Sequence, residues 1–97
     1  MRVREMLSSH PEAAGVVNDV LVQCIEACFD CAQTCISCAD SCLAEATSSR
    51  LAHCIRLDLD CADACATTGS VLSRQTGTPS ALMVQMLETC ADFCRLC

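Results

Sequence analysis

The chain has 97 residues, a length that allows a single domain with one core, residues 1–97. Six arginines and no lysine stand against twelve acidic residues, and the net charge of −6 excludes the basic surface that nucleic-acid binding requires. No apolar run approaches the ~18 residues of a membrane span, so we expect no membrane partner. The charged residues 1–5 are followed by no hydrophobic segment, which indicates that there is no export signal and predicts a cytoplasmic protein.

Cysteine is the dominant feature of the composition, with 12 cysteines against three glycines and two prolines. Such a content is typical of secreted scaffolds held by disulfides, whose folds are rich in loops. Here loop-forming residues are scarce, and the cysteines recur with a helical period. Thiols at positions i and i+4 of one helix are also poorly placed for the torsion of a disulfide. We therefore expect reduced thiols in a helical domain.

The first predicted helix runs from Pro11 to about Ala46, after a segment, residues 9–12, that resembles a capping box with an early proline. Its six cysteines are separated by steps of 4, 3, 4, 3 and 4, which keep the side chains on one face. An apolar stripe lies one residue beyond the cysteines, and acidic residues follow, so we expect a helix buried on two sides. The six are Cys24, Cys28, Cys31, Cys35, Cys38 and Cys42.

The second predicted helix runs from about Arg50 to Ser73. Its cysteines are Cys54, Cys61 and Cys65, and Asp58 occupies the position where the 4, 3, 4 spacing would place another cysteine. This spacing points Asp58 toward the thiol-bearing face, although an acid at this position could also reach solvent.

The third predicted helix begins after an N-cap at Thr78, with Pro79 in its first turn, and runs to the chain end. It carries Cys90, Cys94 and Cys97. Because short connections make consecutive helices antiparallel, the apolar half of every helix should lie at one end and the thiol half at the other. The predicted fold is all-α, an up-down antiparallel helical bundle with a cysteine-lined core.

A thiol-lined helix face favours soft metals. Thiolates at i and i+4 lie ~6 Å apart along the helix axis, and two of them can hold one Cu(I) ion in a near-linear arrangement. Zn(II) requires four ligands around a tetrahedron. The spacing offers many overlapping pairs and no isolated quartet, which predicts several Cu(I) ions per chain rather than one structural zinc.

The ladder of six cysteines from Cys24 to Cys42, followed by the segment Arg56-Leu-Asp-Leu-Asp-Cys-Ala-Asp-Ala-Cys65, closely resembles the bacterial copper storage proteins. The resemblance implies their cytosolic branch and a four-helix bundle, usually a tetramer, that stores Cu(I) for a copper chaperone or an apo-enzyme recipient. Family members continue the third helix and add a cysteine-bearing fourth, whereas this sequence stops at Cys97. The implied metal ligands are the twelve cysteines together with Asp58, whose position is Asn or Asp in the family.

The cysteine pattern also allows functions other than copper storage. A general soft-metal sink, in particular for zinc, and a thiol redox buffer both remain open. An iron–sulfur cluster fits poorly, because ferredoxin cysteines lie in a looping run that ends in proline. No nucleophile, base and orienting residue occur together, so we expect no enzyme activity.

Several residues outside the cysteine ladder could assist copper uptake or could be ordinary surface and core residues. His53 directly precedes Cys54 at the thiol end. Met6 and His10 are one helical turn apart, and Met83 and Met86 lie on an apolar face.

The apolar stripe of the first helix predicts self-association into a homo-oligomer. With three helices in the chain, we expect Ile25, Phe29, Ile36 and Leu43 to meet water unless another copy covers them.

Overall fold

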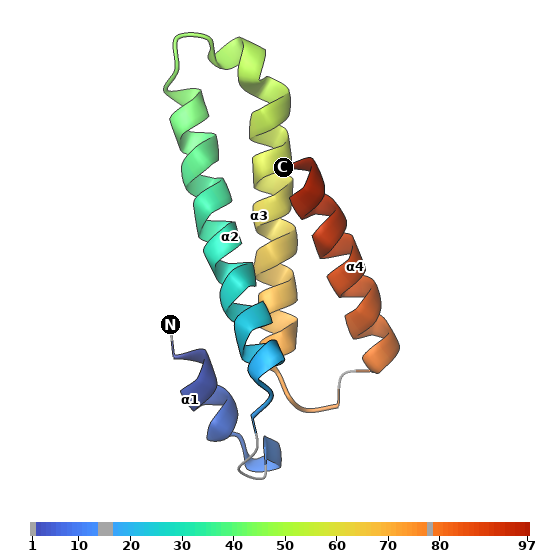
Figure 1. Cartoon of the computed structure of the whole chain (residues 1–97). Coiled ribbons are helices and arrows are strands. Elements are labelled where there is room, and N and C mark those ends of the chain that lie inside the picture. The colour runs from blue at the N-terminus through green and yellow to red at the C-terminus, as the bar shows by residue number, and fades with distance from the viewer. Residues whose placement is uncertain (1, 14–16, 78) are drawn as a thin grey trace.

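The computed structural model of the protein describes residues 2–13, 17–77 and 79–97. Every element in these ranges is helical, which confirms the all-α class (Figure 1). In chain order they are α1 (Val3–Ser8), the 3-10 helix η1 (Pro11–Ala13), α2 (Asp19–Leu43), the 3-10 helix η2 (Ser48–Leu51), α3 (Ala52–Ser73) and α4 (Ser80–Leu96).

The long helices α2 and α3 form an antiparallel pair in contact along most of their length, and α4 packs chiefly on α3 (Figure 1). The up-down-up order of α2, α3 and α4 agrees with the predicted bundle. Helix α4 begins at Ser80 behind an extended Pro79. The predicted cap Thr78 lies outside the described residues.

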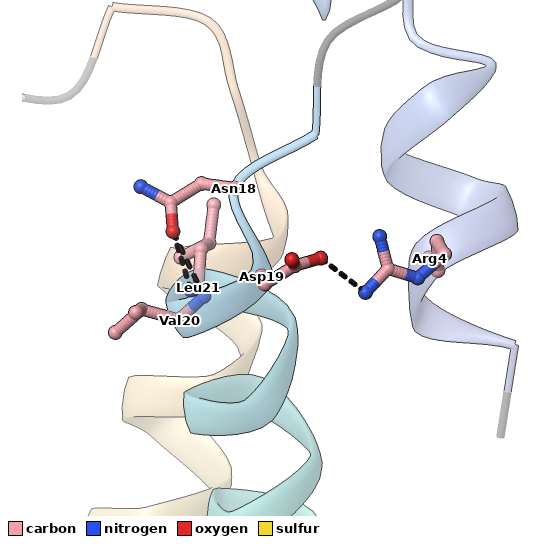
Figure 2. A network of polar contacts seen from close by, with 5 residues as sticks. All are labelled: Arg4, Asn18, Asp19, Val20 and Leu21. Atoms are coloured by element: carbon pink, nitrogen blue, oxygen red, sulfur yellow. Dashed lines mark hydrogen bonds and ion pairs between the residues drawn. The ribbon is translucent and has the colours of Figure 1, made fainter.

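The start of the first long helix differs from the prediction. Helix α2 begins at Asp19, not at Pro11, and ends at Leu43. Its N-cap is Asn18, whose Oδ1 accepts hydrogen bonds from the backbone N–H groups of Val20 and Leu21 at 2.9 and 3.2 Å (Figure 2). An N-cap asparagine satisfies amides that have no partner within the helix, so it defines the first turn. The predicted capping box instead leads into the single 3-10 turn η1.

Helix α1 was not predicted. Its buried side chains, Val3 and Leu7, join an apolar cluster completed by Val22, Ile25 and Leu72. Arg4 pairs with Asp19 and so ties α1 to the first turn of α2 (Figure 2). Six residues with two buried side chains give too short a pattern for periodicity to reveal, and α1 is held by these contacts with the bundle.

Two side-chain clusters lie at different levels along the bundle, as the direction of the stripes predicts. The apolar cluster gathers α1, the start of α2 and the end of α3. The thiol cluster is further along α2 and includes residues of α3 and α4. Its buried members are Cys28, Ala32, Cys35, Cys61, Ala62, Cys65 and Cys90.

The expected exposure of the apolar stripe on α2 is correct for only half of its members. Ile36 and Leu43 are 57% and 60% exposed. Ile25 is fully buried in the apolar cluster and Phe29 is half-buried against it, because α1 and the end of α3 cover this part of α2.

Among the described residues, one helix, α2, is long and apolar enough by composition to cross a membrane, contrary to the expectation from sequence. Six of its 25 residues are cysteines, which count as apolar in such a test. The core helix of a soluble protein meets the same criterion, and the buried face of α2 packs on α3.

Candidate metal centre

Four thiols from three helices converge in the thiol cluster. The Sγ atoms of Cys31 on α2, Cys61 and Cys65 on α3, and Cys94 on α4 all lie within 4.8 Å of one another. Cys31 and Cys61 are 3.9 Å apart across the α2–α3 interface, and Cys65 and Cys94 are 3.5 Å apart across the α3–α4 interface. The three helices therefore bring together a quartet of thiols that the cysteines of a single helix could not form.

A second group adjoins the first and shares one thiol with it. Cys61 also lies within 4.8 Å of Cys35 on α2 and Cys97 at the end of α4. The Sγ atoms of Cys35 and Cys97 are 3.4 Å apart. Because Cys61 belongs to both groups, the quartet is not isolated, and one thiolate could bridge two metal ions.

A third group contains Asp58, the one carboxylate among the predicted ligands. Cys38, Cys42 and Asp58 have ligand atoms within 4.8 Å of one another. Asp58 is only 7% exposed, so its side chain points into the core as the cysteine spacing indicates. Its Oδ1 accepts a hydrogen bond from the thiol of Cys97 at 3.0 Å.

The remaining predicted ligands occupy the two ends of the ladder. Cys90 lies 3.6 Å from Cys65, and buried Cys28 packs in the same thiol cluster. Cys24 packs against the apolar cluster instead, and Cys54 is exposed near the start of α3. These four belong to none of the three groups of converging ligand atoms.

Burial keeps most core thiols protonated. It raises the pKa of Cys28, with help from neighbouring Cys90 and Cys24, from 9.0 to about 12. Burial, reinforced by the thiol of Cys97, raises the pKa of Cys35 to about 12 as well, and burial shifts the pKa of Cys61 upward still further. Neutral thiols behave as small apolar groups, so these thiols can pack in the metal-free core without adding charge to it.

In three thiols, specific neighbours shift the pKa more than burial does. The hydrogen bond and the charge of Asp58 raise the pKa of Cys38 to about 11, and the same hydrogen-bond partner raises the pKa of Cys97. Burial alone would raise the pKa of Cys31, but hydrogen bonds from four surrounding thiols lower it. The thiol of Cys31 therefore loses its proton more readily than those of the neighbouring Cys35 and Cys61, whose pKa is raised.

The other residues considered for copper uptake lie apart from the thiol groups. His53 and Met6 are exposed, and His10 uses Nδ1 to accept the backbone N–H of Glu12. Met83 packs against the apolar cluster. Met86 lines an open groove between α3 and α4 with a volume of about 750 Å³.

One residue important for the core was not singled out from the sequence. Gly69, on α3, lies against the ring of Phe29 on α2. The available signal was a glycine in the interior of a predicted helix, which often marks a close approach of two elements.

Comparisons with known proteins agree with this geometry. The sequence model of a family described as copper storage protein matches residues 17–97. The structure of a copper storage protein from Streptomyces lividans loaded with 10 copper equivalents is 44% identical, with a TM-score of 0.91 over 98% of this chain and 73% of that one. A structure of a cytosolic copper storage protein from Streptomyces lividans with five coppers is 47% identical, with a TM-score of 0.80 over 81% of this chain and 66% of that one.

A relative is also found in Bacillus subtilis, where it is named an uncharacterized cysteine-rich protein. It is 45% identical over 74 residues, which are 76% of this chain. The match spans 65% of the length of that relative.

Proposed function

The chain belongs to the copper storage protein family, and on that premise we propose that it stores and buffers several Cu(I) ions through the thiolates of its core. The proposed ligands are the twelve cysteines and Asp58. The observation that carries the proposal is the chain of three adjoining ligand groups, with Cys61 common to two of them. A single structural ion would need one closed group, whereas linked groups with shared thiols suit a multinuclear store.

The thiol donors favour Cu(I) over harder metals. Cu(I) prefers soft sulfur ligands and accepts two or three of them, so pairs such as Cys35 and Cys97 suffice. Pairwise, unshared use of 12 thiols would hold about six ions, and bridging thiolates raise that limit. The protein would act as a binding protein and not as an enzyme.

Zinc is the second candidate, and one observation favours it. The quartet Cys31, Cys61, Cys65 and Cys94 has the four sulfur ligands that a tetrahedral Zn(II) site requires. A thiol redox buffer would use the same free thiols, but it has no need for groups of three and four ligand atoms from different helices.

A competition experiment separates these candidates. Reduced protein is incubated under anaerobic conditions with equal, excess amounts of Cu(I) and Zn(II), and the metals that elute with the protein are counted. We expect several copper ions and little zinc. One zinc ion per chain with little copper would reject copper storage in favour of the zinc site.

We further propose a cytoplasmic location and assembly of identical chains, as the cytosolic relative and the family's usual tetramer suggest, with a copper chaperone or an apo-enzyme as recipient. Support for assembly comes from Ile36 and Leu43, which are exposed one heptad apart on α2. Sedimentation of the reduced protein should show association that Ile36→Ser/Leu43→Ser weakens and Val84→Ser, an exposed residue of α4, does not. A single monomeric species would contradict assembly.

A further inference from the structure

Helices α2 and α3 approach each other closely where the ring of Phe29 lies against Gly69. A Cβ atom added at Gly69 would lie 2.8 Å from Cε2 and 3.0 Å from Cζ of the Phe29 ring, so close that the ring or the helix would have to shift. Gly69 has no positive φ that would explain a glycine here, and it lies in the interior of α3, where alanine is a better helix former. The reason for glycine at this position is therefore the space that the ring occupies.

This contact lies at the boundary between the two clusters. Phe29 packs against the apolar cluster, whereas its neighbour Cys28 belongs to the thiol cluster. On the facing helix, Gly69 lies one turn beyond Cys65 and three residues before Leu72 of the apolar cluster. The Phe29 ring therefore fills the space left by the missing side chain of Gly69, which we call the glycine notch, and this contact lies at the end of the thiol cluster.

We propose that Phe29 and Gly69 are positioning residues for the metal core: the ring seated in the glycine notch sets the separation of α2 and α3 that lets Cys31 meet Cys61 and Cys65. The role in copper binding rests on the proposed function. The role in spacing the helices does not, because it concerns the metal-free chain.

The distances across the interface explain why the spacing matters. The Sγ atoms of Cys31 and Cys61 are 3.9 Å apart and come from different helices. Metal–ligand distances tolerate only about ±0.2 Å, so a displacement of α2 from α3 by a fraction of an ångström removes a shared ligand. Cys61 and Cys65 are 0% and 1% exposed, and the same displacement would admit reagents to them.

The test uses two readouts on the reduced full chain. The first is the rate at which buried thiols of the metal-free protein react with an aromatic disulfide reagent, and the second is the number of Cu(I) ions retained against a competing chelator. Gly69→Ala should expose Cys61 and Cys65 to reaction about tenfold faster and should lower the number of retained ions. Both changes are expected although alanine favours the helix, so a propensity effect would have the opposite sign.

Rescue and control variants assign the effect to the contact. Phe29→Leu/Gly69→Ala removes the ring atoms that would clash and should restore both readouts toward those of the unsubstituted protein. Thr67→Ala, an exposed change two residues away on α3, should alter neither. If Gly69→Ala does not fold, Phe29→Ala tests the same contact from the other side, because an empty notch should also loosen the thiols.

The outcomes separate the two proposals. Unchanged thiol reactivity and copper number in Gly69→Ala, or in Phe29→Ala where the former does not fold, would overturn the positioning role. So would a double variant that fails to restore them. If the unsubstituted protein retains no more than one or two ions, copper storage fails, while the thiol reactivity still decides whether the contact spaces the helices.

Discussion

The thiol of Cys97, at the end of α4, donates a hydrogen bond of 3.0 Å to the carboxylate of Asp58 on α3. The bond joins two helices at the level where the thiols of Cys38 and Cys42 also lie within 4.8 Å of an oxygen of Asp58. A carboxylate that is only 7% exposed needs such a partner, and here a thiol provides it. Asp58 thus occupies a cysteine position in space as well as in sequence.

Replacing Asp58 with a thiol should therefore extend the metal core. We expect Asp58→Cys to raise the number of tightly bound Cu(I) ions, because the new sulfur would lie beside Cys38, Cys42 and Cys97. The measurement is metal analysis after anaerobic titration and gel filtration. Asp63→Cys is the matched control, since it adds a thiol to the exposed face of the same helix. If both variants bound the same additional number of Cu(I) ions, a thiol at position 58 would be no better placed for metal binding than one on the exposed face.

The metal-free, reduced protein should already be helical. Its core thiols are neutral and pack as small apolar groups, and the apolar cluster contributes burial that needs no metal. Circular dichroism of the metal-free protein should show a helical spectrum that copper changes little. A random-coil spectrum that becomes helical only with metal would mean that the fold depends on the ion, as in zinc fingers.

Alkaline solution should weaken the metal-free fold. Burial raises the pKa of Cys28 and of Cys35 from 9.0 to about 12, so folded thiols keep their protons at a pH where unfolded thiols lose them. This contribution to stability is complete below pH 9 and is lost as pH rises towards 12. Urea unfolding across this range should give a falling free energy, with a shallower fall in Cys28→Ala. A constant free energy would contradict the burial of these thiols.

Helix α1 should stabilise the fold without affecting the metal core. Leu7 is 4% exposed in the apolar cluster, and Leu7→Ala should lower the free energy of unfolding by about 2–4 kcal/mol. The number of bound Cu(I) ions should fall by no more than the contribution of Cys24, which packs against this cluster, because the three groups of converging ligand atoms lie further along the bundle. Met6→Ala, an exposed residue of the same helix, should have little effect on either quantity. A copper number that falls further in Leu7→Ala would show that the two ends are coupled.

The helices and their directions could be predicted from sequence because cysteine spacing is a local signal. The steps of 4 and 3 determine one face of each helix, and the order of apolar and thiol halves along each helix requires antiparallel packing. Asp58 was placed correctly for the same reason.

Other features depend on how the helices pack against one another, and the residue spacing within one helix carries no information about that packing. The quartet of Cys31, Cys61, Cys65 and Cys94 requires a particular axial alignment of three helices. The start of α2 at Asp19 depends on the side chain of Asn18, which competed with a capping signal further upstream. Helix α1 exists through contacts with the bundle, and so its sequence alone gave little indication of it.

The number of Cu(I) ions that one chain holds tests the central claim most directly. Reduced protein is titrated with Cu(I) under anaerobic conditions, freed of loosely bound metal by a competing chelator, and analysed for copper and protein. Linked thiol groups with a shared Cys61 predict saturation at several ions, about six or more per chain. Saturation at one or two ions per chain would contradict storage and would leave the quartet as an ordinary single-metal site.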